Sequence, residues 1–266
     1  MTQHLHVVVA QNPAELVGPR ARLDWLAQSL NTIQDRAVDL LVLPELFLTG
    51  YNVGEQIYKW AETRDGPFAA EITNLAKRHC LAIHYSYAER TEGGIYNASA
   101  CISKDGAYLG GHRKLLLPPG FEADHFICGD SCTYFEVAGF KIATLICYDG
   151  EFPETFRKVA QDGVHLVIVP TALGAQWAVV AEKVIPASAF QNGVFICYAN
   201  QAGNENGMPY HGGSCIVDPT GEELARANKN PELLHAVLDA SLVAKSQARM
   251  PYLRDLKKLP WLLPPP

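Results

Sequence analysis

The chain of 266 residues is long enough to bury a large core in one α/β domain. Apolar residues make up 48% of it and charged residues 19%, ordinary proportions for a soluble globular protein. The formal net charge of −6 provides no electrostatic attraction to a nucleic-acid backbone or an anionic lipid surface, so we expect neither nucleic acid nor a membrane as a partner.

The N-terminus, MTQHLHVVVAQN, lacks the basic and long apolar segments of a secretory signal peptide. No window approaches the ~20 consecutive apolar residues that span a bilayer. The seven cysteines are scattered without a Cys-x-x-Cys pair, which argues against a disulfide framework or a structural zinc site. We therefore expect a cytoplasmic protein without a bound metal.

Apolar and β-branched runs predict strands, and apolar residues at helical spacing predict helices. The expected elements are, in chain order, a strand at 4–11, a helix at 21–38, a strand at 39–46, a helix at 69–80, a strand at 81–90, a hairpin at 95–114 turning at Lys104-Asp105-Gly106, a hairpin at 133–149 turning at Ala138-Gly139, a helix at 153–163, a strand at 165–173, a helix at 176–193, a strand at 194–201, a hairpin at 212–224, and a strand and helix at 235–250.

This mixture predicts a layered sheet sandwich with helices outside, in a single domain covering 1–266. The Pro-rich apolar tail at 256–266 cannot continue a helix and exposes Trp261. We expect this tail to pack on a partner subunit rather than extend into water.

Cys147 lies between an apolar run and a proline. The run at 140–146 predicts a strand, and Pro153 suits the first turn of a helix, so the cysteine falls in a sharp strand-to-helix connection. Backbone N–H groups converge in such a connection, which lowers a thiol pKa and favours the nucleophilic thiolate. The alternative for an isolated cysteine is a buried, inert thiol.

Three charged residues also stand at the ends of predicted elements. Glu45 follows Pro44 at the end of an apolar strand, where a carboxylate either faces a cleft or caps a loop; burial would raise its pKa towards that of a general base. Lys114 ends a predicted strand, where it is either solvated or able to stabilise an oxyanion. Glu122 could pair with that lysine or stand exposed in its loop.

These four residues occur in the order Glu, Lys, Glu, Cys, and the segments around them resemble the nitrilase (carbon–nitrogen hydrolase) superfamily. The matching segments are PELFLTGY at 44–51, YNASACISKDG at 96–106, HRKLLLP at 112–118, FEADHFICGD at 121–130, ICYDGEFPE at 146–154, ANQAG at 199–203, GGSCIVDPTGE at 212–222 and PYLRD at 251–255. The resemblance covers essentially the whole chain and favours a functional Cys147.

The resemblance implies a four-layer αββα sandwich whose subunits commonly pair, so a homodimer or higher homo-oligomer is expected. It implies neither a metal nor an organic cofactor. By position it implies four catalytic roles: Glu45 as general base, Lys114 as the oxyanion-stabilising lysine, Glu122 as the supporting second glutamate and Cys147 as nucleophile.

The expected activity is that of an amidase, which hydrolyses a small carboxamide to an acid and ammonia. Cys147 attacks the amide carbonyl while Glu45 accepts the thiol proton, and a thioester forms that water then hydrolyses. Lys114 and the backbone N–H of Tyr148 hold the oxyanion. The CYDGEFPE form resembles amidase-type members, whereas true nitrilases tend to carry Trp-Glu after the cysteine.

Five residues are expected to bind the substrate: Tyr51, Tyr148, Glu151, Thr171 and Ala172. Tyr51, Thr171 and Ala172 would line the acyl pocket, although Tyr51 could simply pack and Thr171 could simply satisfy a backbone group. Glu151 stands where several relatives carry arginine. It would disfavour an acid-bearing substrate and favour an amine, unless it is a solvated turn carboxylate.

Three positions depart from the family pattern. Ser188 and Gln191 stand where many members have the Arg and Glu of an Arg-Ala-x-Glu-Asn motif, and their loss removes a charge pair that would tie a helix to the site region. His112 replaces the usual tyrosine before the Arg-Lys pair. These changes bear on substrate identity, because the four catalytic positions are intact.

Other functions stay open. A nitrile-cleaving or N-carbamoyl-cleaving enzyme would share the fold, and a catalytically silent scaffold protein would keep the fold alone. A cysteine phosphatase loop needs an arginine six positions after the cysteine, where Pro153 stands. A Cys–His hydrolase is less favoured, because none of the nine histidines has a strand-end setting like that of Glu45.

Overall fold

Two six-stranded sheets packed face to face form the centre of the protein. The structure is a computed structural model and describes residues 3–259. The first sheet contains β1 (His4–Gln11), β2 (Leu40–Val42), β3 (Ala82–Thr91), β4 (Gly94–Ile102), β5 (Tyr108–Arg113) and β14 (Glu232–Asp239), in the order β14-β1-β2-β3-β4-β5. The second contains β6 (Tyr134–Val137), β7 (Phe140–Thr144), β8 (Leu166–Pro170), β9 (Phe195–Ala199), β12 (Cys215–Val217) and β13 (Glu223–Arg226), in the order β13-β12-β9-β8-β7-β6.

A separate two-stranded hairpin and several helices complete the described chain. The hairpin consists of β10 (Ala202–Glu205) and β11 (Met208–His211). The α-helices are α1 (Gly18–Thr32), α2 (Gln56–Trp60), α3 (Pro67–His79), α4 (Phe121–His125), α5 (Pro153–Gln161), α6 (Ile185–Asn192), α7 (Ser241–Arg249) and α8 (Tyr252–Asp255). Short 3₁₀ or π turns are η1 (Cys147–Glu151), η2 (Ala175–Trp177), η3 (Val180–Val184) and η4 (Leu256–Lys258).

Both faces of each sheet are buried, which explains why the central strands read as continuous apolar runs. In β1, Val7 and Val9 point towards the second sheet, while Val8 and Ala10 point towards α1 and α3. Successive side chains of a strand alternate between its two faces, so one strand supplies both layers of core. The second sheet packs its other face on α5 and α6 in the same way.

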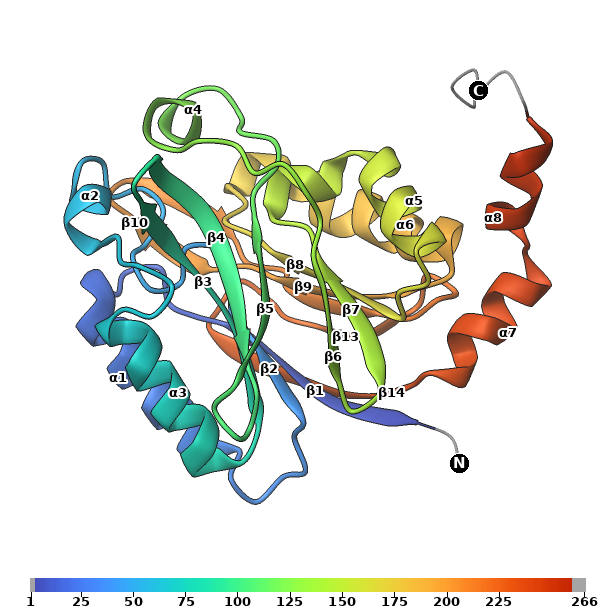
Figure 1. The fold of residues 1–266 in the computed structure, drawn as a ribbon, viewed down its shortest axis with the longest axis horizontal. Helices are drawn as coiled ribbons and strands as arrows, with labels where there is room; N and C mark the ends of the chain where they lie inside the picture. The colour runs from blue at the N-terminus through green and yellow to red at the C-terminus, as the bar shows by residue number, and fades with distance from the viewer. Residues whose placement is uncertain (1–2, 260–266) are drawn as a thin grey trace.

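The layers therefore follow the order helices, sheet, sheet, helices. Figure 1 shows α1 and α3 on one side of the stacked sheets and α5 and α6 on the other. The predicted four-layer αββα sandwich is confirmed. Among the helices that the structure describes, none combines the length and apolar character needed to cross a bilayer.

Parallel pairing brings the ends of distant strands to common edges. β1, β2 and β3 run parallel to one another in the first sheet, and β7, β8 and β9 do so in the second. Glu45 follows β2, and Cys147 follows β7. Polar residues placed directly after buried strands in this way are well positioned to meet at one site.

Several predicted elements are shorter than the sequence pattern suggested; the helix predicted at 176–193, for example, is divided into η2, η3 and α6. The helix predicted at 21–38 ends at Thr32, because the chain must turn to enter β2, where the Asp39 N–H bonds the His6 carbonyl. The strand predicted at 39–46 ends at Val42. Pro44 has no N–H for a strand ladder, and Leu46 has a left-handed φ of 47°.

The β10–β11 hairpin is absent from the predicted elements, although its turn carries a recognisable signal. Asn206 and Gly207 occupy the turn with φ of 49° and 86°, which Asn-Gly pairs adopt readily. Most of the 256–266 tail, including Trp261, lies outside the described residues.

Candidate active site

A buried lysine lies between two buried glutamates. Lys114 Nζ donates hydrogen bonds to Glu45 Oε1 at 2.7 Å and to Glu122 Oε1 at 2.6 Å. All three side chains are at most 1% exposed. Charges removed from water to this extent are stable only when they are paired and hydrogen-bonded, so these three residues form one electrostatic unit.

Three separate elements deliver these side chains. Glu45 leaves the first sheet just after β2, and Leu46 next to it has a positive φ that turns the chain sharply. Lys114 follows β5 directly, and its N–H still bonds the Asn97 carbonyl of β4 at 2.8 Å. Glu122 lies in the first turn of α4. The sheet thus fixes Glu45 and Lys114, and a short helix closes over them with Glu122.

Asn97 of β4 is a site residue that the sequence reasoning missed. Its Nδ2 donates to Glu45 Oε1 at 2.7 Å and to Glu122 Oε2 at 3.0 Å, and the side chain is fully buried. It therefore holds the two carboxylates at a set separation. A lone amide inside an otherwise apolar strand was the available signal, because a buried amide needs hydrogen-bond partners.

Tyr51 contacts the same cluster through Glu122. Its hydroxyl donates to Glu122 Oε1 at 2.7 Å. The Tyr51 backbone N–H bonds Glu205 of β10 at 3.0 Å, and Glu205 also accepts a hydrogen bond from the buried Arg22 of α1 at 2.8 Å. The missed hairpin thus positions the loop that carries Tyr51.

Cys147 has a strained backbone at a tight connection. Its φ is 46°, in the left-handed region that side-chain-bearing residues seldom occupy, and it begins η1. Pro153 is the first residue of α5, as expected. Left-handed backbone at a non-glycine residue costs about 1–3 kcal/mol and is found preferentially at functional sites.

The Asp149 carboxylate joins the connection that carries Cys147 to the residues that follow Lys114. Asp149 Oδ2 accepts the Ile146 N–H at 3.1 Å, and Asp149 Oδ1 accepts the Leu116 N–H at 2.9 Å. His112 Nε2 lies 3.1 Å from Asp149 Oδ2, and both side chains are buried. His112, which stands where the family usually has a tyrosine, therefore supports the turn that carries Cys147.

The environment sets the protonation of each member of the cluster. Burial, opposed by Lys114 and reinforced by Glu122, raises the pKa of Glu45 to about 7. Burial alone would lower the pKa of Lys114, but the neighbouring Glu45, Cys147 and Glu122 raise it above its ordinary value. The lysine therefore stays charged, while Glu45 is able to exchange a proton near neutral pH.

The expectation that the strand-to-helix connection lowers the thiol pKa is wrong. Burial, followed by the charge of Glu45, raises the pKa of the Cys147 thiol, and the opposing effects of Lys114 and a hydrogen bond from Thr171 are smaller. A partly buried thiol beside two carboxylates holds its proton more tightly than a free thiol in water does. It needs a base to remove that proton, and Glu45 lies within its electrostatic reach.

A cavity of about 510 Å³ opens beside Cys147. Its walls include four of the five residues expected to bind substrate: Tyr51, Tyr148, Glu151 and Ala172. Thr171 is not among the lining residues; it is fully buried beside the thiol, and its hydroxyl oxygen lies 3.4 Å from that of Tyr198. Its position is behind the nucleophile rather than in the pocket wall.

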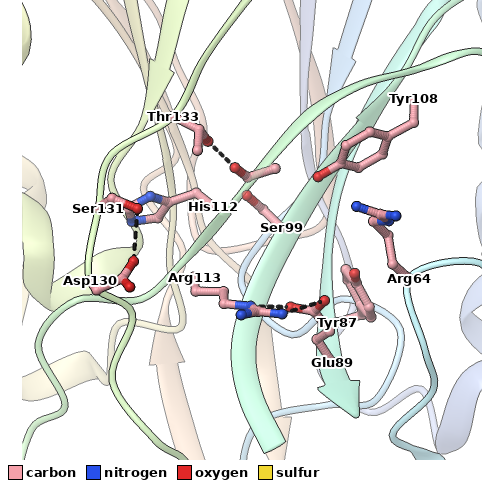
Figure 2. A pocket seen from close by; sticks show the side chains of 11 residues that line it. Arg64, Tyr87, Glu89, Ser99, Tyr108, His112, Arg113, Asp130, Ser131 and Thr133 are labelled. Carbon is pink, nitrogen blue, oxygen red and sulfur yellow. Dashed lines mark hydrogen bonds and ion pairs between the residues drawn. The ribbon is translucent and has the colours of Figure 1, made fainter. Parts of the chain in front are cut away.

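A second cavity, of about 220 Å³, is more polar and is shown in Figure 2. Arg113 donates to Glu89 at 2.6 and 2.9 Å, and Asp130 accepts from Ser131 at 2.8 Å (Figure 2), while the Arg64 guanidinium lies 5.0 Å from the centre of the Tyr108 ring. Cys147 does not line it. The larger cavity, which Cys147 lines, is therefore the candidate active site.

Ser188 and Gln191 of α6 form no charged link to the site. Ser188 is buried, and its carbonyl accepts the Asn192 amide at 2.9 Å; the Gln191 carbonyl accepts Arg157 of α5 at 2.9 Å. The two outer helices are thus joined to each other through a backbone acceptor.

The chemistry of the site is that of a free thiol. All seven cysteines are unpaired. Within residues 3–259, no group of three or more His, Cys, Asp or Glu side chains is arranged to hold a metal ion. The arrangement of thiol, general base and buried ammonium defines a class of enzymes that act by nucleophilic catalysis.

Comparison with known proteins identifies the family. Residues 8–247 match the family model described as carbon-nitrogen hydrolase, and the chain belongs to this family. It is 39% identical to a protein of Pseudomonas protegens named "Hydrolase in pqqF 5'region", over 91% of this chain and 85% of that protein. It is 34% identical to an (R)-stereoselective amidase of a Pseudomonas species, over 86% of this chain and 84% of the amidase.

A solved structure shows the same fold with a modified thiol. The amidase from Nesterenkonia sp. AN1 superposes with a TM-score of 0.86 and 26% identity, covering 98% of each chain. In that structure, of a mutant of the amidase, the acetamide moiety of fluoroacetamide is covalently added at the active-site cysteine. The expected membership in the nitrilase superfamily, on its amidase-type branch, is confirmed.

Proposed function

We propose that this protein is an amidase that hydrolyses the C–N bond of small carboxamides through a thioester on Cys147. The observation that carries the proposal is the convergence of Cys147 with Glu45, Lys114 and Glu122 beside one cavity. Relatives named as amidases support the same reaction class.

In the first half-reaction, the Cys147 sulfur attacks the amide carbonyl carbon as Glu45 takes the thiol proton. Lys114 and the Tyr148 backbone N–H stabilise the oxyanion, a contribution of about 3–4 kcal/mol per preorganised donor. Protonated Glu45 then gives its proton to the amide nitrogen, the C–N bond breaks, and ammonia leaves. The product on the enzyme is a thioester.

In the second half-reaction, Glu45 takes a proton from water, whose oxygen attacks the thioester carbonyl. The C–S bond then breaks, the sulfur recovers its proton from Glu45, and the carboxylic acid departs. Glu122 holds Lys114 through its 2.6 Å hydrogen bond, so the ammonium group stays in place through both steps. One glutamate thus serves as acid and base in turn.

Replacement of the nucleophile tests this proposal. We expect Cys147→Ala to abolish ammonia release while leaving the circular dichroism spectrum and melting temperature close to those of the wild type. A panel of amides, nitriles and N-carbamoyl compounds separates amidase from nitrilase and carbamoylase activity. Turnover that survives in Cys147→Ala would reject the mechanism. Failure of a thiol-reactive probe to label Cys147 would favour a silent scaffold.

A further inference from the structure

The cavity beside Cys147 carries charge of only one sign. Among the lining residues that the structure describes, Glu122 and Glu151 are charged, and no lysine, arginine or histidine contributes to the wall. Lys114 is fully buried behind this wall, and its two hydrogen bonds go to Glu45 and Glu122. The side chains that a ligand meets along the cavity wall are therefore acidic or uncharged, and Lys114 is reached only at the carbonyl oxygen beside Cys147.

Glu151 differs from Glu122 because its carboxylate has no hydrogen-bond or ion-pair partner among residues 3–259. Glu122 accepts hydrogen bonds from Lys114, Asn97 and Tyr51. Glu151 lies at the end of η1, is partly buried, and receives neither a hydrogen bond nor an ion pair from any residue within 3–259. Burial raises the pKa of Glu151, and Lys114 only partly opposes this effect.

An unpaired, partly buried carboxylate is unfavourable, and a bound cation would offset its cost. Ionised groups that lose water without gaining a partner destabilise the folded state. An ammonium group in the cavity would supply both the opposite charge and the hydrogen-bond donors that Glu151 lacks. The acidic side chain of Glu151 in the cavity wall therefore favours a ligand of positive charge.

The remaining walls suit an organic cation. Tyr51, Tyr148 and Trp177 place aromatic rings around the cavity, and Leu173 and Met208 add apolar surface. Aromatic faces attract ammonium groups through their quadrupoles, and apolar walls accept the methylene groups of an acyl chain. Trp177 is 57% exposed in the free protein, so its ring remains available to a ligand.

We propose that the substrate is a small carboxamide whose acyl part carries a protonated amine, with the ammonium group bound by Glu151. This proposal rests on the amide hydrolysis proposed above. The ammonium group binds at Glu151 while the carbonyl carbon reaches the Cys147 sulfur, four residues away in the chain. An acid-bearing amide would instead bring a third carboxylate to a wall formed by Glu122 and Glu151.

Matched substrates test the charge preference. Each set pairs a cation with a neutral isostere and an anion of equal length: β-alaninamide, butanamide and succinamate, then γ-aminobutyramide, pentanamide and glutaramate. We expect kcat/KM to be at least about tenfold higher for the cation than for the neutral amide, and lowest for the anion, in one or both sets. Equal or lower values for both cations would overturn the proposal while amide hydrolysis itself stood.

The variant Glu151→Gln removes the charge and keeps the shape. We expect its cation-to-neutral ratio of kcat/KM to fall to about a third of the wild-type ratio or less. Glu154→Gln is the matched control, because Glu154 is exposed on α5 and lies outside the cavity lining. It should keep the wild-type ratio. Both kcat/KM values of a ratio are measured on the same preparation, so any loss of folded enzyme cancels from the ratio. An unchanged ratio in Glu151→Gln would overturn the role of Glu151.

Thiol labelling separates failure of this proposal from failure of the proposed reaction. Cationic aminoethyl methanethiosulfonate and anionic sulfonatoethyl methanethiosulfonate modify Cys147 without amide hydrolysis, and peptide mass spectrometry resolves it from the other cysteines. We expect the cation to react faster, and Glu151→Gln to reduce this advantage. If no amide is hydrolysed, the amidase proposal fails and the labelling ratio still decides whether the cavity selects cations; equal rates would overturn that selectivity.

Discussion

Glu45 illustrates how burial changes the chemistry of a single residue. A glutamate in water is ionised well below neutral pH. Glu45 is fully buried, and the hydrogen bonds from Lys114 and Asn97 only partly offset the loss of hydration and the nearby charge of Glu122, so its pKa rises to about 7. At that value the carboxylate is basic enough to take a thiol proton and still substantially ionised in neutral solution.

The raised pKa predicts an acid limb in the activity profile. The base form of Glu45 is lost as the pH falls through about 7, so kcat/KM should decline below that pH. Because Glu45 takes up a single proton, each further pH unit below this value lowers kcat/KM about tenfold. Initial rates of ammonia release across a pH series measure this limb.

A reversibility control excludes acid denaturation as the cause of the decline in kcat/KM at acid pH. Enzyme held at acid pH and returned to neutral buffer should recover full activity. A profile that stays flat down to about pH 5, as an ordinary glutamate would allow, would contradict the role of Glu45.

The surroundings of Cys147 and Glu45 raise the pKa of both groups. The thiol keeps its proton because burial and Glu45 raise its pKa, so the resting nucleophile is neutral. The reaction therefore requires Glu45 to take the thiol proton. This requirement follows from the buried site and was not apparent from a cysteine at a strand end.

At the scale of elements, the connection after β7 depends on Asp149. Its carboxylate accepts hydrogen bonds from the backbone N–H of Ile146, which precedes the nucleophile, and from that of Leu116, two residues after Lys114. A single side chain thus joins two segments that carry reacting groups. Because Cys147 has a left-handed backbone, the turn needs such external support.

Asp149→Asn should weaken both stability and turnover. The amide nitrogen would face buried N–H donors, which costs about 2–4 kcal/mol in the free energy of unfolding. A shift of the nucleophile should lower kcat by at least about tenfold and change KM less. Urea unfolding and steady-state kinetics measure the two effects.

Asp218→Asn provides a matched control in the β12–β13 turn, where Asp218 accepts the Thr220 and Glu222 N–H groups at 2.7 and 3.1 Å. It should cost stability without lowering kcat. If Asp149→Asn loses stability but keeps wild-type kcat, Asp149 does not position the nucleophile.

Short-range signals predicted most of the elements. The turns at Lys104-Asp105-Gly106 and Ala138-Gly139 are confirmed between β4 and β5 and between β6 and β7, because Gly106 and Gly139 accept the left-handed backbone that these turns require. The ends of α1 and β2 were wrong, since both depend on where the chain must go next. The Asn206-Gly207 turn had an equally clear local signal that was overlooked.

At the scale of the whole molecule, face-to-face sheets turn sequence-distant strand ends into one site. Asn97 and Glu45 are separated by 52 residues, yet their side chains are 2.7 Å apart. The Arg22–Glu205 pair joins α1 to the β10 hairpin across 183 residues. Contacts between segments far apart in the chain therefore hold the site together.

The oligomeric state of the protein and its cytoplasmic location are predictions. We expect a homodimer in solution, with the tail at 256–266 packed on the partner subunit. Sedimentation equilibrium over a range of concentrations should give the mass of two chains, and deletion of 256–266 should shift the equilibrium towards the monomer. A wild-type monomer at every concentration would contradict the expected pairing, and an unchanged dimer after deletion would contradict the role of the tail.

The sequence by itself predicted most of the elements, the family and the four residues Glu45, Lys114, Glu122 and Cys147 that the structure brings together, because periodicity and motifs are local properties of a chain. Only the tertiary structure decided that Asn97 and Asp149 hold the site together, that Thr171 lies behind the thiol, and that the thiol pKa is raised. These outcomes depend on burial and on charges contributed by segments far apart in the chain, and folding alone brings those segments together.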